Sequence, residues 1–235
     1  MNSNSIVRIL AASILPIAFI GCTSSEIGES KDVAQDKIYQ QYNISYTQAN
    51  ANAEVYSQFR FAGEKGTTLV LSSPSKVELD GTPIKVDSSD YSGAFYKTDQ
   101  PIGSFYGKHQ LAFTDINNRK YVNDFTFDQF KLVNVPVNAN KSQPLIIHYE
   151  TAPLSGDDYI KISTSNTDSS FSINHNATDV SGNIEIPAKE LLRQKVKNLS
   201  LSATLYRKRS LQQNTAEGGI LTITYALNPI LIELK

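Results

Sequence analysis

The chain has almost none of the residues that build disulfide frameworks and cysteine-ligated metal centres. Its 235 residues include one cysteine, one methionine and no tryptophan. A single thiol forms no intramolecular disulfide, and it cannot supply the several cysteine ligands of a structural zinc site. The lone cysteine, Cys22, therefore needs another explanation, and its position in the sequence offers one.

Neither sign of charge predominates, and long hydrophobic runs are also scarce. Lys and Arg number 22 against 23 Asp and Glu, which gives a formal net charge of −1 and a pI near 6.3. This balance argues against a nucleic-acid partner, which selects for a basic protein. After residue 22, no apolar run approaches the roughly 20 residues of a membrane-spanning helix.

The first 21 residues have the pattern of a secretory signal. Arg8 supplies a positive charge, and the apolar run from Ile9 to Ile20 is too short to span a bilayer. Residues 19–22, Phe-Ile-Gly-Cys, resemble a bacterial lipobox, with phenylalanine where the pattern favours leucine. The resemblance implies that residues 1–21 are a cleaved lipoprotein signal peptide and that the sulfur of Cys22 carries a diacylglycerol thioether.

Lipid on Cys22 would anchor the protein to a membrane, because two or three acyl chains give stable attachment. In lipoproteins of this kind, aspartate after the cysteine retains the protein in the inner membrane. Thr23 stands there instead, so the resemblance implies a cell-envelope protein sorted to the outer membrane. The polar stretch 22–36 lacks periodicity, and we expect a flexible tether.

From residue 38 onward, apolar and polar residues alternate with the period of two that half-buried strands require. Asp80-Gly81 between two alternating runs predicts a tight hairpin. Only the segment from Pro187 to Lys195 looks helical, with proline suited to a helix start. Many short strands about ten residues apart predict an all-β chain of β-sandwiches.

A change in composition predicts two sandwiches in tandem. Tyrosine and phenylalanine are concentrated between residues 37 and 136, and 134–144 has the composition of a linker. We therefore expect a β-sandwich domain over 37–136 and another over 137–235, with one larger sandwich as the alternative. The strand order of 182–235 resembles the closing strands of an immunoglobulin-like sandwich. The whole chain resembles uncharacterised Gram-negative envelope lipoproteins with paired sandwiches, a class that implies no activity.

Two stretches are candidates for binding. Aromatic residues among Gly, Pro and polar residues could stack on sugar rings, although aromatic side chains also commonly fill a sandwich core. These residues are Tyr91, Phe95, Tyr96, Phe105 and Tyr106. Basic residues that cluster late in the chain could meet anionic lipid or acidic polysaccharide, or could simply form a solvated face that protects sheet edges. The residues proposed for this basic patch are Lys195, Lys197, Arg207, Lys208 and Arg209.

The sequence offers no catalytic motif and no metal-ligand motif. The three histidines are far apart, and His148 and His175 fit strand positions. The segment from Asp115 departs from a calcium loop at Arg119, and Asp157-Asp158 suits a turn. We therefore expect no cofactor, no metal and a non-enzymatic role in binding or assembly, with polysaccharide or another envelope protein as ligand. A structural subunit of an envelope complex and an envelope hydrolase remain the alternatives.

Overall fold

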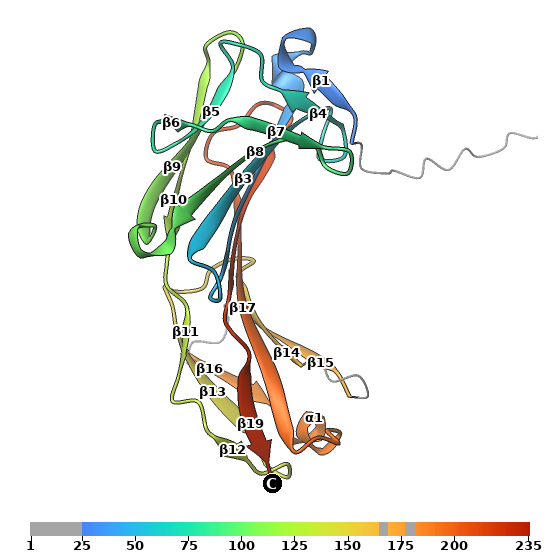
Figure 1. Cartoon of the computed structure of the whole chain (residues 1–235), viewed down its shortest axis with the longest axis vertical. Coiled ribbons are helices and arrows are strands. Elements are labelled where there is room, and N and C mark those ends of the chain that lie inside the picture. The colour runs from blue at the N-terminus through green and yellow to red at the C-terminus, as the bar shows by residue number, and fades with distance from the viewer. Residues whose placement is uncertain (1–24, 165–168, 177–181) are drawn as a thin grey trace, which may run out of the picture.

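The computed structural model describes residues 25–164, 169–176 and 182–235, which form a curved, elongated molecule of two lobes (Figure 1). Strands make up nearly all of its regular structure. Each lobe is a β-sandwich, so the prediction of an all-β chain with two β-sandwiches is confirmed. In the described residues, no helix is long and apolar enough to cross a membrane.

Two sheets face each other in the upper lobe. The first contains β1 (Ile27–Glu29), β4 (Thr67–Val70), β3 (Asn52–Phe61), β2 (Ile38–Thr47) and β18 (Gly219–Ala226), and β8 (Gly93–Pro101) and β7 (Val86–Ser89) extend it from β3. The second has the order β10 (Lys120–Phe127), β9 (Gly107–Thr114), β5 (Lys76–Leu79), β6 (Thr82–Pro83). The rings of Phe59 on β3 and Phe113 on β9 lie 4.6 Å apart between the sheets.

The lower lobe is built in the same way from shorter strands. One layer contains β12 (Asn138–Ala139), β19 (Ile230–Leu234), β17 (Asn198–Ser210), β14 (Tyr159–Thr164) and β15 (Phe171–Asn176). The other has the order β11 (Lys131–Val133), β13 (Leu145–Glu150), β16 (Asn183–Ile186). The one α-helix among the described residues, α1 (Ala188–Leu192), lies at the end of this lobe (Figure 1).

The two lobes share strands. The first part of β17 pairs with β19 in the lower lobe, and its last part pairs with β18 in the upper lobe. β18 in turn pairs in parallel with β2 along its whole length. The predicted division between 136 and 137 therefore needs correction, because the C-terminal half of the chain supplies strands to the upper sandwich.

The expected flexible tether over 22–36 is wrong for the residues that the structure describes. Ile27–Glu29 form β1, which pairs in parallel with β4, and Ser30 is fully buried. Short 3₁₀ turns follow at Ser30–Asp32 and Gln35–Lys37. Backbone pairing and the Ser30 hydroxyl, which accepts from the Ser72 N–H at 2.8 Å, order a segment that has no apolar periodicity of its own.

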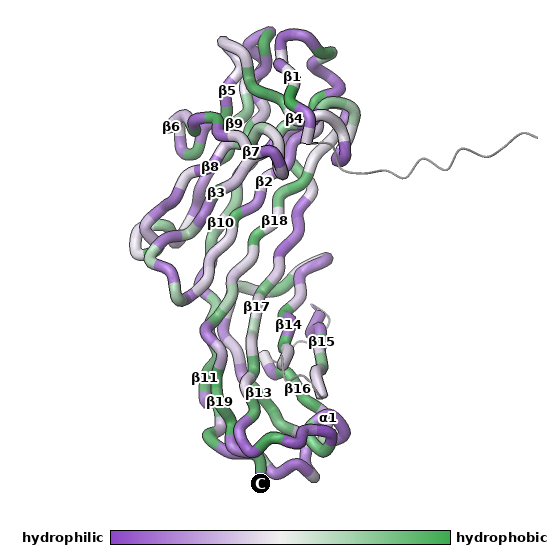
Figure 2. The backbone as a smooth tube through the Cα atoms, turned by 45° about the vertical axis from the view of Figure 1, so that its right-hand side comes forward, coloured by the Kyte–Doolittle hydropathy of each residue, from purple (hydrophilic) through white to green (hydrophobic). Residues whose placement is uncertain are grey.

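Alternating burial along the strands produces the core. The pattern buries one face of β2, β17 and β18, as the sequence predicts, and hydrophobic positions alternate along the tube in Figure 2. The buried side chains of both lobes belong to one hydrophobic cluster. The Asp80-Gly81 hairpin is confirmed, with positive φ at both residues, as is the short helix after Pro187.

Candidate functional site

Strand β10 forms an edge of the second upper sheet, and part of that edge is covered. Residues 122 and 124 turn their backbone groups away from β9. The Val122 N–H donates to Gln213 Oε1 at 2.9 Å, and the Asp124 N–H donates to Gln212 Oε1 at 3.0 Å. Gln212 Nε2 also donates to the Asp124 carbonyl at 3.3 Å. Two glutamine side chains from the β17–β18 loop thus take the place of a neighbouring strand.

The edge is open one step further along, at Thr126. Because backbone direction alternates along a strand, the N–H and C=O of Thr126 point the same way as those of residues 122 and 124. Within the described part of the chain, neither group has a hydrogen-bond partner, and Thr126 is exposed. An unpaired edge of this kind is a template for another strand.

A groove of about 470 Å³ lies beside this open edge. It is lined by the buried side chains of Phe125, Leu221 and Ile223 and by the charged side chains of Asp124, Asp128 and Arg209. The first upper sheet continues under the groove through β17 and β18, whereas the second sheet stops at β10. The groove therefore occupies the position of the next strand of the second sheet.

A buried ion-pair cluster closes the far side of the groove. The carboxylate of Asp158, whose side chain is fully buried, accepts from Arg207 Nη1 at 3.0 Å and from Arg209 Nη2 at 2.7 Å. Arg207 also donates to the carbonyl oxygens of Ala152 and Pro153, at 2.8 and 3.2 Å. These contacts fasten the 151–158 loop to the end of β17 and hold the groove wall in place.

The charge state of Asp158 follows from opposing effects. Burial alone would raise the pKa of its carboxyl, but the hydrogen bond from Arg209, the N–H of Ser155 and the two positive charges together lower that pKa below its ordinary value. The same contact raises the pKa of Arg209. Asp158 is therefore ionised and is occupied in holding the two arginines.

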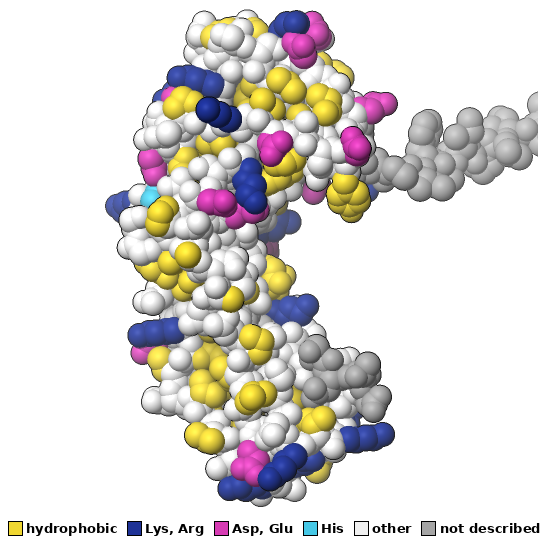
Figure 3. Space-filling model, viewed as in Figure 1, with side chains coloured by type: hydrophobic (Ala, Val, Ile, Leu, Met, Phe, Trp, Pro, Cys, Tyr) yellow, Lys and Arg dark blue, Asp and Glu magenta, His cyan; other side chains and the backbone are white. Residues whose placement is uncertain are grey.

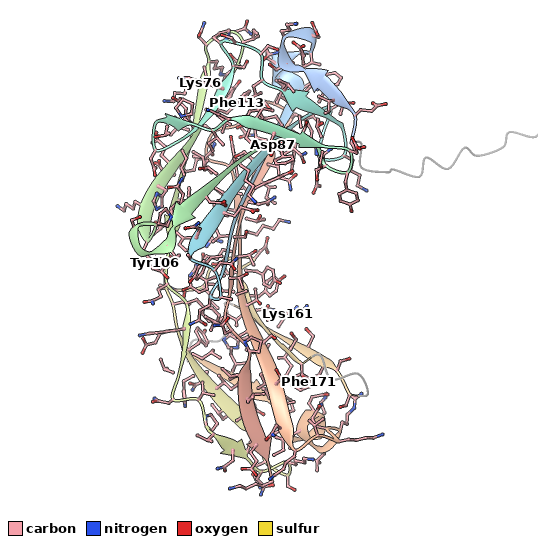
Figure 4. The ribbon with its side chains drawn as sticks, viewed as in Figure 1. Lys76, Asp87, Tyr106, Phe113, Lys161 and Phe171 are labelled. Atoms are coloured by element: carbon pink, nitrogen blue, oxygen red, sulfur yellow. The ribbon has the colours of Figure 1, made fainter. Side chains whose placement is uncertain are left out.

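The five aromatic candidates do not form one surface. Tyr96 and Phe105 are buried, and the Tyr96 hydroxyl accepts from the Leu71 N–H at 2.6 Å. Phe95 stacks on Tyr56, and Tyr91 is 94% exposed at the β7–β8 turn. Only Phe105 and Tyr106 come together, through Phe127, and Figure 4 places Tyr106 near the junction of the lobes. Stacking of a sugar along all five residues has no geometric basis.

The predicted basic patch is also divided. Lys195 and Lys197 precede β17, and Arg207, Lys208 and Arg209 lie at its other end, roughly 30 Å or more away at about 3.3 Å per residue. Lys197 pairs with Glu233 at 3.1 Å, and Arg207 is buried against Asp158. Positive and negative side chains are interspersed over the face in Figure 3.

The histidines serve local hydrogen bonds. His109 contacts Asp80 Oδ2 at 2.7 Å and the Phe105 carbonyl at 2.8 Å, and His148 contacts Asn183. His175 is buried and lies 3.1 Å from the Tyr149 hydroxyl. Asp115 caps its own hairpin turn by accepting from two backbone N–H groups. Among the described residues, no three His, Cys, Asp or Glu side chains are grouped to hold a metal ion.

No protein-family model and no curated protein matches the sequence. Among solved structures, the chain is similar to "Crystal structure of DIP-gamma IG1+IG2", with a TM-score of 0.23, 9% identity, and coverage of 83% of this chain and 94% of that chain. It is also similar to "Crystal structure of Dpr11 IG1 bound to DIP-gamma IG+IG2", with a TM-score of 0.22, 11% identity, and coverage of 82% and 96%. At such low TM-scores these likenesses support no functional conclusion, and the fold assignment rests on the strand pairings.

Proposed function

We propose that the protein is a lipid-anchored binding protein of the cell envelope, attached through Cys22 to the outer membrane, and that it holds an extended segment of a partner polypeptide against β10. Cys22 lies outside the described residues, so the anchor is supported by the lipobox-like sequence alone. The observation that carries the binding role is the outward-facing backbone pair of Thr126 beside the groove.

A polypeptide fits this site better than a polysaccharide does. An extended chain offers a backbone N–H and C=O pair that matches the open pair of Thr126, and its alternate side chains would enter the groove over Leu221 and Ile223. The two glutamines already satisfy the neighbouring positions in the way a strand would. The dispersed aromatic residues give no comparable platform for a sugar.

The anchor is tested by the intact mass of the protein from the membrane fraction of its own host. We expect the mass of residues 22–235 plus a diacylglyceryl group, with or without a further acyl chain. The Cys22→Ala variant is expected to lack this modification and to leave the membrane fraction. An unmodified wild-type chain would refute the anchor and would leave the groove as a separate question.

The Thr126→Pro variant tests the binding site. Proline removes the outward N–H, and an edge strand tolerates it because that N–H has no partner in the sheet. We expect Thr126→Pro to abolish partner binding, whereas Thr126→Val, which keeps the N–H, retains it. Circular dichroism and thermal unfolding would show that both variants fold.

Binding would be measured by photocrosslinking from a benzoylphenylalanine placed at Asp128, which lines the groove, in the native host, with the crosslinked peptides sequenced. Strand addition predicts crosslinks to one extended segment of one protein, lost in Thr126→Pro. The identified segment is then synthesised and titrated against both variants. Equal crosslinking in both variants, or crosslinks to glycan only, would reject strand addition at this edge.

A further inference from the structure

Three exposed hydrophobic side chains of the upper lobe lie on β1, on β7 and at the β7–β8 turn, which are connected through the contact between β4 and β8. Ile27 on β1 is 51% exposed, Val86 on β7 is 47% exposed, and Tyr91 at the β7–β8 turn is 94% exposed. Tyr91 is the most exposed large hydrophobic residue in the described part of the chain. Figure 3 shows hydrophobic side chains gathered on this part of the upper lobe.

The β7–β8 turn packs directly against the start of the described chain. The Ala94 N–H donates to Thr68 Oγ1 at 2.9 Å, and that hydroxyl donates to the Glu26 carbonyl at 2.6 Å. Gly93, at φ +70°, leaves no room for a side chain, since a Cβ there would lie 2.9 Å from the Ser25 carbonyl oxygen. Figure 1 shows the beginning of β1 beside this turn.

The position of Ser25 limits how far Tyr91 can be from the anchor. Cys22 precedes Ser25 by three residues, which span at most about 11 Å when fully extended. Tyr91 is two residues from Gly93, which adds at most about 7 Å of backbone to that span. A tyrosine that near to an acylated cysteine lies within reach of the membrane surface. Its ring is apolar and its hydroxyl polar, a combination that favours the interface between headgroups and acyl chains.

We propose that the β7–β8 turn is a second membrane contact, in which Tyr91 enters the lipid interface beside the acylated Cys22. This inference rests on the lipid anchor proposed above. Asp90 lies in the turn directly before Tyr91, and Figure 4 shows Asp87 on β7. These carboxylates disfavour an anionic surface, so the contact suits zwitterionic lipid. The contact would fix the orientation of the upper lobe on the membrane.

The absence of tryptophan provides a direct test. Tyr91→Trp creates a protein with one tryptophan, and Leu231→Trp places the matched probe on β19 in the lower lobe, where Leu231 is 70% exposed. Residues 22–235 of each variant would be coupled through the single thiol to maleimide lipid in phosphatidylcholine vesicles. This coupling does not depend on acylation in the host. The vesicle experiment therefore tests the Tyr91 contact alone, and the intact-mass experiment tests the natural anchor alone.

We expect the emission of Tyr91→Trp to shift to the blue on coupling and to be quenched by brominated phosphatidylcholine. Leu231→Trp should show neither change. Emission of Tyr91→Trp that stays as in solution, with the protein demonstrably coupled, would overturn the proposal. Equal quenching of both probes would also overturn it, because the protein would then lie on the membrane without a preferred contact.

Discussion

Asp158→Asn is expected to lower the free energy of unfolding by about 3–5 kcal/mol, the cost of removing one partner from a buried ion pair. The substitution keeps the size of the side chain but leaves Arg207, whose side chain is 6% exposed, without an anion. Arg209→Gln is the matched control. The Arg209 side chain is 38% exposed, so its contact with Asp158 is partly screened by water. We therefore expect a smaller loss of stability from this substitution.

Urea unfolding of the three proteins at neutral pH would measure these differences. Adding Arg207→Met to Asp158→Asn should restore part of the lost stability, since the uncompensated buried charge is then removed. If Asp158→Asn costs less than about 1 kcal/mol, a value usual for surface pairs, the cluster is not the buried pair described above.

The ionised carboxylate of Asp158 should also make the stability of the protein depend on pH. The pKa of Asp158 is lower in the folded protein than in the unfolded chain, where an aspartate titrates near 3.9. Its contribution to stability is therefore fully present above about pH 4 and is lost as pH falls through the folded pKa. We expect the stability difference between wild type and Asp158→Asn to be constant from pH 7 to 5 and to shrink below pH 4. A difference that grows on acidification would contradict this assignment.

Strand positions were readable from the sequence because burial with period two leaves a direct record in residue type. The alternation along β2, β17 and β18 and the Asp80-Gly81 turn are local features, and the structure confirms them. The same alternation could also have predicted the buried ion pair. Arg207 shares the face of Leu201, Ala203 and Leu205, so an inward arginine required a buried anion, which is Asp158.

Contacts between segments that are far apart in the chain produce no such pattern in the sequence. The pairing of β18 with β2 joins residues from opposite ends of the chain, and a division drawn from aromatic composition could not detect it. β1 has no buried apolar face, because backbone pairing with β4 and the buried Ser30 order this segment instead. The groove beside β10 depends on where one sheet stops while the other continues, which alternation does not encode.

Phe127→Ala is expected to destabilise the protein by about 3–5 kcal/mol, as for other fully buried phenylalanines. The Phe127 ring lies 5.2 Å from Phe105, 5.9 Å from Tyr106 and 5.8 Å from Tyr225. Tyr225 belongs to β18, and burial raises the pKa of its hydroxyl. The lost ring would leave a cavity where the N-terminal strands meet the strand supplied by the C-terminal half.

Tyr106→Phe is the matched control for this cluster. It keeps the ring beside Phe127 and removes only the 3.0 Å hydrogen bond between the Tyr106 and Tyr225 hydroxyls, so we expect a loss of about 0.5–1.5 kcal/mol. Because β17 and β18 join the lobes, wild-type unfolding followed by tyrosine fluorescence and by far-ultraviolet circular dichroism should give one coincident transition. Separate transitions in the wild type, with Phe127→Ala shifting only one of them, would mean that the shared strands do not couple the two sandwiches.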